Sequence, residues 1–204
     1  MNKKLTGVIL FGDSVLFGTG ATVRNNGCSR ILRGFLKDRP VIIKCKNRDT
    51  TKDGLKRLNF DVLDDDICSH VIILFGNNDC KLIDIDTPAV SLERYKENLT
   101  KIIKEIKNVD KIPILSNLQP IDYSLVCKTL PDVIERIANI DKSDDFHKKY
   151  SIVCNEVAMS ENIKLADIFS ELKKYGKVVI ANDGIHPSDL GHKVIAQKFL
   201  DILM

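Results

Sequence analysis

Long hydrophobic runs are missing from this sequence of 204 residues. Its longest purely apolar runs, such as residues 71–75, are far shorter than the roughly 20 residues that a transmembrane helix needs. We therefore expect no membrane-spanning segment. Lys3 and Lys4 resemble the start of a secretory signal, but Gly12 and Asp13 interrupt the apolar stretch at residues 8–11 before a signal core develops. For that reason we expect the protein to be cytoplasmic.

An excess of one sign of charge is missing as well. The 31 basic and 28 acidic residues are interspersed and leave a formal net charge of +3. A protein whose main partner is nucleic acid usually carries a basic patch or stripe, so this charge pattern disfavours nucleic acid as the partner. The sequence has no internal repeat, low-complexity tract or linker, and its length predicts a single domain over residues 1–204.

The cysteines lack the CxxC spacing of zinc sites and redox motifs. Six cysteines are scattered at positions 28, 45, 68, 80, 127 and 154. A disulfide framework is typical of short secreted chains rather than of a chain with this length and pattern. We therefore expect reduced thiols, mostly packed in the interior.

Short apolar segments alternate with segments of helical periodicity along the chain. The predicted strands are residues 7–11, 41–45, 71–75, 112–115 and 163–166, each bounded by polar or turn residues. The predicted helices include residues 91–107, residues 145–160 and a last helix from about Ser188, whose hydroxyl can cap it. The apolar residues of this last helix are expected on one stripe, namely Leu190, Val194, Ile195, Phe199 and Ile202. This alternation predicts a doubly wound α/β sandwich with a parallel sheet of about five strands.

Residues 119–144 do not fit the simple alternation. They contain Pro120, Pro131 and a short amphipathic stretch at residues 133–140, and they follow the fourth predicted strand. Loops after the carboxyl ends of strands are where α/β proteins bind ligands. The segment is therefore either a cover over a ligand pocket or a surface flap without contact to the substrate.

Ser14 follows the first predicted strand, within the tripeptide Gly12-Asp13-Ser14. A serine at a strand-to-helix turn exposes its hydroxyl and places its backbone N–H at a helix N-terminus, which suits a nucleophile that attacks a carbonyl group. Taken alone, the tripeptide favours an ordinary turn in which the serine caps a helix. It does not match the nucleophile elbow, because Leu16 stands where the second glycine of that motif belongs.

Asp183 and His186 stand three residues apart, and Pro187 keeps His186 out of a helical conformation. In a loop of that length the carboxylate can accept a hydrogen bond from one imidazole nitrogen while the other nitrogen faces a nucleophile. The alternative is an Asp-Gly turn before a helix. Residues 76–80, which follow the third predicted strand, include an asparagine pair that can either donate to an oxyanion or form a turn.

Three motifs in this order resemble a known family. Gly12-Asp13-Ser14, Gly76-Asn77-Asn78-Asp79 and Asp183-Gly184-Ile185-His186 resemble blocks I, III and V of the SGNH hydrolases, also called GDSL esterases and lipases. The three blocks span nearly the whole chain. The resemblance implies a flavodoxin-like three-layer α/β/α fold and a carboxylic ester hydrolase that needs no cofactor.

The resemblance also implies roles for single residues. Ser14 would be the nucleophile, His186 the general base and Asp183 the residue that orients His186. The side chain of Asn78 and the backbone N–H of Ser14 would donate hydrogen bonds to the oxyanion. Val15 replaces the leucine of the family's GDSL name, which is a change in packing rather than in chemistry.

The family's second block departs further from its usual pattern in this sequence. That block supplies a glycine whose backbone N–H is another oxyanion donor, and an alignment on Asp49-Thr50 places Arg48 at the glycine position. Every residue other than proline has a backbone N–H, so Arg48 can complete the oxyanion hole if its backbone adopts the required angles. The alternative is that this alignment slips by one or two residues.

Other candidate residues have simpler expected roles. Cys80 directly follows the motif Gly76-Asn77-Asn78-Asp79 and is expected to be a packed thiol rather than a reactive one. His192 is expected on the exposed side of the last helix. His70 and His147 have no partner that the sequence identifies.

The sequence thus predicts a serine esterase that cleaves small-molecule carboxylic esters, with a short acyl chain, through an acyl-enzyme. Asp13, Asp79 and Asp183 could form a carboxylate metal site, but the resemblance accounts for all three without a metal ion. Two alternatives stay open. One is a thioesterase or lysophospholipase of the same family, and the other is a binding or scaffold protein whose site has degenerated with the loss of the second-block glycine.

Overall fold

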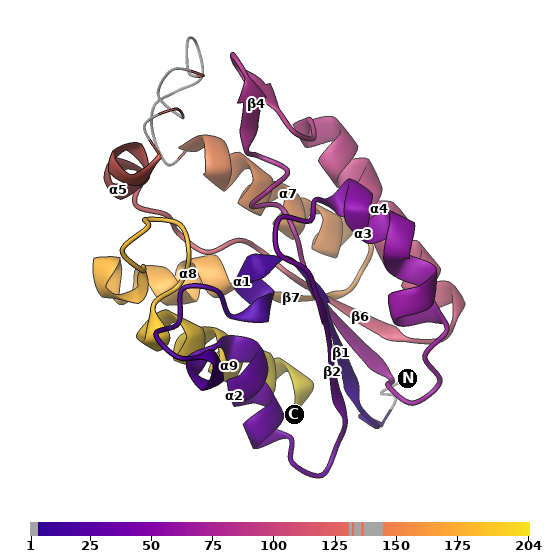
Figure 1. Cartoon of the computed structure of the whole chain (residues 1–204). Coiled ribbons are helices and arrows are strands. Elements are labelled where there is room, and N and C mark those ends of the chain that lie inside the picture. The colour runs from indigo at the N-terminus through magenta and orange to yellow at the C-terminus, as the bar shows by residue number, and fades with distance from the viewer. Residues whose placement is uncertain (1–3, 131, 133–135, 137–144) are drawn as a thin grey trace.

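The computed structural model describes residues 4–130, 132, 136 and 145–204, and its main feature is one parallel sheet (Figure 1). The strands of this sheet are β1 (Val8–Gly12), β2 (Val41–Cys45), β3 (His70–Leu74), β6 (Ile112–Ser116) and β7 (Lys164–Ala166). All five predicted strands are confirmed, to within one residue at each end. Every residue of β1 and β3 is buried, as is usual for parallel strands that are covered on both faces.

The strand order is β2-β1-β3-β6-β7, and all neighbours run parallel. Gly12 at the end of β1 is in register with Cys45 of β2 and with Leu74 of β3, so these three strands end at the same level. In such an order, the crevice at the carboxyl ends of β1 and β3 is the usual place for a ligand. The flavodoxin-like three-layer sandwich is therefore confirmed.

Helices cover both faces of the sheet (Figure 1). One layer contains α2 (Cys28–Phe35), α8 (Ile168–Lys173) and α9 (Asp189–Leu203), and the other contains α3 (Thr51–Leu58), α4 (Leu92–Asn108) and α7 (Asp145–Ser160). The predicted helices at residues 91–107, at residues 145–160 and from Ser188 are confirmed. The hydroxyl of Ser188 caps α9 by accepting a hydrogen bond from the backbone N–H of Gly191. No helix among the described residues is both long enough and apolar enough to cross a membrane.

The shorter elements lie mainly at the carboxyl edge of the sheet. They are α1 (Ser14–Phe17), the antiparallel hairpin of β4 (Leu82–Asp84) and β5 (Thr87–Pro88), α5 (Tyr123–Thr129), two 3-10 turns (Arg24–Asn26 and Gly176–Val179) and a π-helical turn (Asn59–Leu63). The hairpin was not predicted, because two strands this short leave no clear alternation in the sequence. The amphipathic stretch predicted at residues 133–140 lies, apart from Arg136, outside the described residues.

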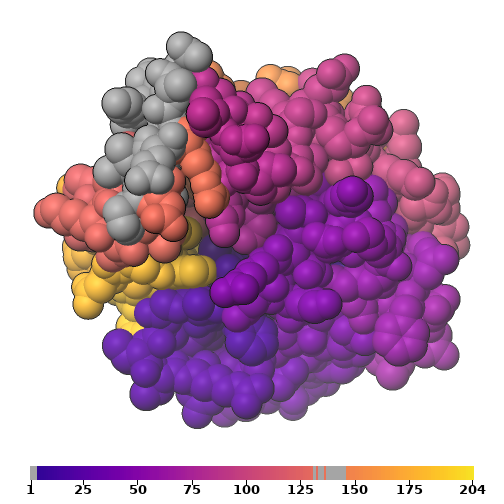
Figure 2. Space-filling view, turned by 45° about the horizontal axis from the view of Figure 1, so that its top comes forward, coloured from indigo at the N-terminus to yellow at the C-terminus, as the bar shows by residue number. Residues whose placement is uncertain are grey.

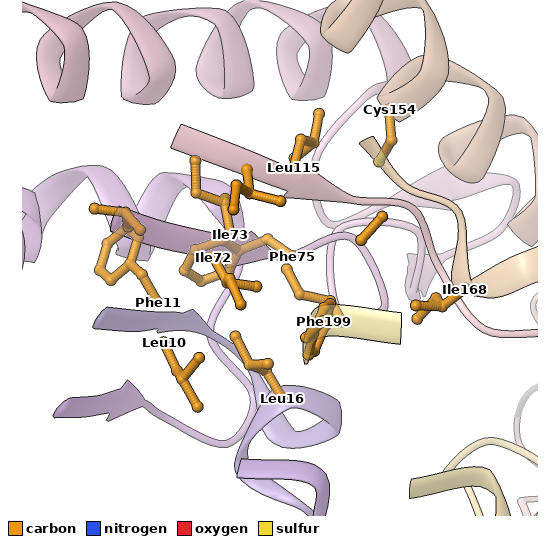
Figure 3. Close-up of a cluster of buried hydrophobic side chains, with 14 of the residues drawn as sticks. Leu10, Phe11, Leu16, Ile72, Ile73, Phe75, Leu115, Cys154, Ile168 and Phe199 are labelled. Atoms are coloured by element: carbon orange, nitrogen blue, oxygen red, sulfur yellow. The ribbon is translucent and has the colours of Figure 1, made fainter. Parts of the chain in front are cut away.

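The core joins side chains of the sheet to both helix layers (Figure 3). Phe11 of β1 and Phe75, just after β3, meet edge to face with ring centroids 5.1 Å apart. The six cysteines are free, and four of them are buried, which confirms the expectation of mostly packed thiols. Burial raises the pKa of the Cys28 and Cys154 thiols to about 12, so both stay neutral and unreactive at physiological pH.

Candidate active site

Ser14 is the first residue of α1 and follows directly after β1. Asp13 caps this short helix, because its carboxylate accepts a hydrogen bond from the backbone N–H of Val15 at 2.9 Å. The helix ends at Gly18, whose left-handed φ of 108° turns the chain back. The backbone N–H of Ser14 has no acceptor among the described residues and is therefore free to bind a ligand atom.

His186 connects Ser14 to Asp183 by two hydrogen bonds. Its Nε2 atom lies 3.0 Å from Oγ of Ser14, and its Nδ1 atom lies 2.6 Å from Oδ2 of Asp183. The other carboxylate oxygen of Asp183 accepts the backbone N–H groups of Ile185 and His186, each at 2.9 Å. The Asp183 carboxylate thus holds the backbone of its own loop in place. The side chains of Ser14, His186 and Asp183 form one continuous chain of hydrogen bonds.

The charge of Asp183 determines the tautomer of His186. Burial acts to raise the pKa of the Asp183 carboxyl, but the hydrogen bonds from His186 and Ile185 outweigh it and hold that pKa below its usual value. An ionised Asp183 can only accept, so Nδ1 of His186 carries the proton. Nε2 of the neutral imidazole is then the acceptor for the hydroxyl proton of Ser14.

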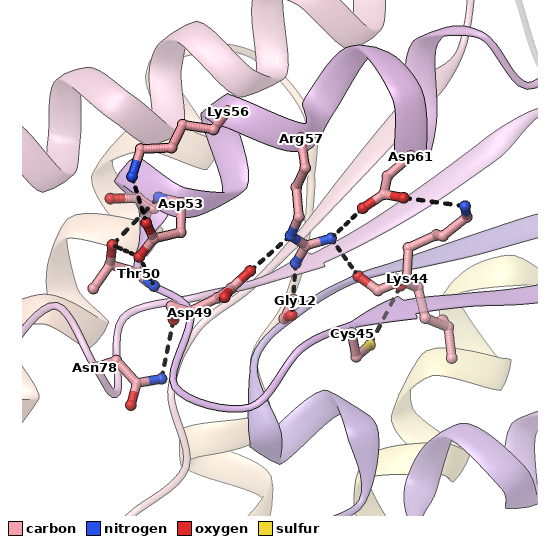
Figure 4. Close-up of polar contacts among 12 residues, drawn as sticks. Gly12, Lys44, Cys45, Asp49, Thr50, Asp53, Lys56, Arg57, Asp61 and Asn78 are labelled. Atoms are coloured by element: carbon pink, nitrogen blue, oxygen red, sulfur yellow. Dashed lines mark hydrogen bonds and ion pairs between the residues drawn. The ribbon is translucent and has the colours of Figure 1, made fainter.

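Arg48 and Asn78 lie at the same pocket as Ser14 and His186. Arg48 has a φ of 69°, the left-handed region that favours glycine. Its backbone N–H has no acceptor in the described part of the chain. One N–H of the Asn78 amide donates to the Asp49 carbonyl at 3.0 Å, which leaves its second N–H available (Figure 4).

The loop that carries Arg48 is fixed by an arginine of α3 (Figure 4). The Arg57 guanidinium donates to the Asp49 carboxylate at 2.7 Å and to the Gly12 carbonyl at 3.1 Å, and it lies 4.5 Å from the ring centroid of Phe11. A charged, multiply hydrogen-bonded contact of this kind restricts the loop strongly. The ends of β1 and β2 are therefore held together next to Ser14.

A second hydrogen-bonded group, which the sequence did not reveal, lies beside the first. The Asn77 amide donates to Oδ2 of Asp13 at 3.0 Å, and its carbonyl oxygen accepts from Nε2 of Gln119 at 2.8 Å and from Nε2 of His147 at 3.0 Å. Gln119 also donates to the Ile185 carbonyl at 3.0 Å, next to His186. This group links the helix of Ser14 to the loop of His186 through the half-buried Asn77 and the buried Asp13, Gln119 and His147.

Burial governs the charge of this second group. It raises the pKa of Asp13 to about 6, although the hydrogen bond from Asn77 acts in the opposite direction. Burial also lowers the pKa of His147 to about 4, so this imidazole is neutral at physiological pH. One signal in the sequence could have indicated a buried His147, since it precedes Tyr150 and Cys154 on the inward stripe of α7.

The expectation for His192 was wrong. The side chain is fully buried and its Nε2 donates to the Thr19 carbonyl at 3.0 Å. The inward stripe of α9 passes through His192, Ile195 and Phe199, whereas Leu190, assigned to that stripe from the sequence, is 37% exposed. His192 is therefore a structural residue that holds the segment after α1 against α9.

The pocket at these residues has a volume of about 450 Å³. Its wall includes Ser14, Arg48, Asn78 and His186. It also includes side chains of the segment after β6, namely Ile121, Tyr123, Val126 and Leu130. This part of the segment predicted at residues 119–144 therefore lines the pocket. Figure 2 shows stretches that lie far apart in the sequence, coloured indigo, magenta, salmon and yellow, meeting around a hollow on this face.

The three aspartates considered as metal ligands accept hydrogen bonds from the protein instead. Asp13 and Asp183 do so as described, and Asp79 accepts from the backbone N–H and the hydroxyl of Thr51. Burial raises the pKa of Asp79 to about 7. Within the described ranges, no three His, Cys, Asp or Glu side chains are grouped closely enough to hold a metal ion.

The chain is similar to known proteins of one family. The model of the GDSL-like Lipase/Acylhydrolase family matches residues 10–194. The chain is 29% identical over 142 residues to the GDSL esterase/lipase CPRD49 of Arabidopsis thaliana, in a match that covers 66% of this chain and 54% of that protein. The chain spans about half the length of the curated relatives it matches.

Solved structures cover nearly the full length of the chain. A lipase/acylhydrolase from Enterococcus faecalis superposes with a TM-score of 0.77 at 25% identity, over 97% of this chain and 94% of that chain. A catalytic mutant of Axe2, an acetylxylan esterase from Geobacillus stearothermophilus, gives the same TM-score of 0.77 at 21% identity, over 100% of this chain and 96% of that chain. At this lower identity the likeness shows the fold alone.

Proposed function

Since the chain belongs to the GDSL-like lipase/acylhydrolase family, whose members are carboxylic ester hydrolases of the GDSL/SGNH type, we propose that it hydrolyses small-molecule carboxylic esters. The observation that carries the proposal is the continuous chain of hydrogen bonds from Ser14 through His186 to Asp183 at the pocket. A hydroxyl, an imidazole and a carboxylate in this arrangement are what nucleophilic acyl transfer requires.

Ser14 is the proposed nucleophile. Its oxygen forms a bond to the acyl carbon while Nε2 of His186 takes the hydroxyl proton, and Asp183 keeps the resulting imidazolium in place. The carbon–oxygen bond to the alcohol then breaks, and His186 returns the proton to the departing alcohol. Water attacks the acyl-enzyme by the same route, which releases the acid and restores Ser14.

The oxyanion that forms at each stage needs hydrogen-bond donors. The backbone N–H groups of Ser14 and Arg48 and the second N–H of the Asn78 amide are the proposed donors, because none of them is paired with an acceptor of the described chain. The glycine-like φ of Arg48 supports its alignment with the second-block glycine. The same backbone angle supports a complete oxyanion hole over a degenerate binding site.

A short acyl group is the proposed preference. The pocket volume of about 450 Å³ lies toward the lower end of the range usual for small-molecule sites, and it must hold both the acyl and the alcohol part of the ester. Tyr123 and Val126 offer the acyl group apolar contacts. A series of p-nitrophenyl esters from two to twelve carbons tests this preference, and a maximum of kcat/KM at the longest chains would contradict it.

The direct test of hydrolysis compares the wild type with Ser14→Ala on p-nitrophenyl acetate. We expect hydrolysis to be lost while the fold is kept, because removing this hydroxyl from a helix start costs at most about 1 kcal/mol. Circular dichroism and thermal unfolding verify the fold of the variant. Unchanged turnover by a folded Ser14→Ala would exclude Ser14 as the nucleophile.

A further inference from the structure

The described lining of the pocket contains two cations and no acid. Arg48 and Lys81 line it, and no aspartate or glutamate is among its described lining residues. The side chains of both residues are exposed, and neither forms an ion pair within the described part of the chain. By contrast, neighbouring Arg57 is paired with Asp49 and Asp61. Two positive charges at the mouth of the pocket are thus left without a counterion from the residues that the structure describes.

The nearby acids do not neutralise these cations. Asp13 and Asp79 are fully buried behind the pocket wall, where they accept hydrogen bonds from Asn77 and Thr51. Asp183 accepts hydrogen bonds from His186 and from its own loop, and it forms no ion pair with Arg48 or Lys81. Among the described lining residues, an incoming ligand therefore meets Arg48 and Lys81 as the cations without an ion-pair partner.

Arg48 occupies a backbone position that suits glycine better. Its φ of 69° costs free energy for any residue that has a Cβ atom. The exposed guanidinium forms no ion pair within the described chain that would offset this cost in free energy. Backbone strain at a pocket beside a nucleophile is a reason to look for a contact that forms only with a ligand.

Both cations lie over one half of the sheet, and most of the apolar lining residues lie over the other half. Arg48 follows β2 and Lys81 follows β3, whereas the apolar residues at 121–130 follow β6 and Ile185 belongs to a loop after β7. Because the strand order is β2-β1-β3-β6-β7, both cations lie on the β2 to β3 half of the pocket, together with Cys80 and Leu82. Most of the apolar lining lies on the β6 to β7 half, here called the apolar half. Ser14, which follows β1, lies on the half that carries both cations.

From this division we infer that the substrate is an anionic ester, with a carboxylate or phosphate on its alcohol part and an apolar acyl group. The anion would contact Arg48 and Lys81, and the acyl group would lie against the apolar half. A guanidinium forms paired hydrogen bonds with carboxylate or phosphate oxygens, and an ammonium adds a point charge. This inference rests on the proposed ester hydrolysis and adds its substrate class.

The test uses esters that share one acyl group and differ in charge. They are 3-butyryloxybenzoate, its neutral methyl ester, and 3-butyryloxyphenyl phosphate. For each enzyme form, kcat/KM for an anionic ester is divided by kcat/KM for the neutral ester, after both are normalised to their rates of hydroxide-catalysed hydrolysis. This ratio cancels any general damage to catalysis. The phosphate and carboxylate arms show which anion the pocket prefers.

The wild-type ratio should exceed one for at least one anion. Arg48→Gly should lower this ratio by about 10-fold, and glycine is compatible with the left-handed φ at position 48. Lys81→Gln should lower the ratio by about 3-fold. Arg48→Lys should retain most of it. Lys101→Gln is the matched control, because Lys101 is exposed on α4 and away from the pocket, and it should leave the ratio unchanged. Raising the salt concentration should lower the wild-type ratio.

Two results would overturn the inference while leaving ester hydrolysis intact. One is a wild-type ratio at or below one for both anions. The other is an equal loss on neutral and anionic esters in Arg48→Gly and Lys81→Gln, which would mean that these cations act on the oxyanion or on folding alone. Failure of the wild type on all three esters, together with activity on none of the p-nitrophenyl series, would instead refute the proposed function.

Discussion

Replacing Asn77 by alanine is the most informative perturbation of the site outside the Ser14, His186 and Asp183 chain. Asn77 makes three hydrogen bonds through its side chain, to Asp13, Gln119 and His147. The alanine variant removes all three and leaves the buried Asp13 carboxylate without its amide donor. We expect the variant to fold with reduced stability and with a displaced loop at residues 76–80, which carries Asn78.

The expected loss of stability follows from the number and type of these hydrogen bonds. A neutral hydrogen bond contributes about 1 kcal/mol net, and one to a charged group about 1.5–3 kcal/mol. Asn77 is partly exposed to the pocket, so water can replace some of what is lost. We therefore expect the free energy of unfolding to fall by about 3 kcal/mol.

The pH dependence of that loss has a defined sign. Burial raises the pKa of Asp13 from its usual 3.8 to about 6, so the contribution of Asp13 to stability is full below pH 3.8 and is lost as the pH rises through 6. Without the amide of Asn77 the pKa of Asp13 rises further, and the loss of stability continues to higher pH. Each added unit costs about 1.4 kcal/mol, so the variant should be destabilised more at pH 8 than at pH 5.

Urea unfolding of both proteins at pH 5 and at pH 8 measures this difference. Asn182→Ala serves as the control, because Asn182 is exposed and outside the pocket. The reasoning would be refuted if Asn77→Ala were as stable as the control. It would also be refuted if the destabilisation were the same at the two pH values, since Asp13 would then not sense Asn77.

Three further substitutions test other parts of the site. Asn78→Ala should lower kcat by ~10²-fold with little change in KM, because its amide would meet the oxyanion mainly in the transition state, and an effect on KM alone would contradict this. Gly184→Ala should cost about 2 kcal/mol or more and lower kcat/KM, because its φ is 78° and an added Cβ would lie 2.7 Å from the Asp122 carbonyl oxygen; a wild-type melting temperature and activity would count against this. Burial lowers the pKa of His192 from 6.5 to about 4, so its stabilising contribution is full above pH 6.5 and is lost as the pH falls to 4. Between pH 7 and pH 5, the free energy of unfolding of His192→Gln should therefore fall by about 2 kcal/mol less than that of the wild type. Parallel pH profiles of the two proteins in urea unfolding would disprove that.

Local patterns were sufficient to predict the sheet and the pairing of Asp183 with His186. Each strand is a short apolar run, and a parallel sheet brings the residues after such strands to one edge. Asp183 and His186 are three residues apart, so the geometry between them depends on a single loop. Ser14 was connected to that loop by family resemblance, because no local signal spans the 172 positions that separate Ser14 from His186.

The group around Asn77 could not be predicted in this way. Its partners Gln119 and His147 lie 42 and 70 positions further along the chain, and neither belongs to a motif. The position of His192 was missed for a different reason. A small shift in the assumed phase of α9 moves a side chain from its inward stripe to its outward one, and Leu190 was a misleading marker of that phase.

Labelling with a fluorophosphonate probe, followed by peptide mapping, tests the central claim that Ser14 is an activated nucleophile. The probe reacts with a serine whose proton a neighbouring base removes, as His186 is placed to do here. We predict a single label, on Ser14, in the wild type, no label in Ser14→Ala, and a strongly slowed reaction in His186→Ala. A folded wild-type protein that stays unlabelled at Ser14, or that carries the label on another serine, would contradict the account.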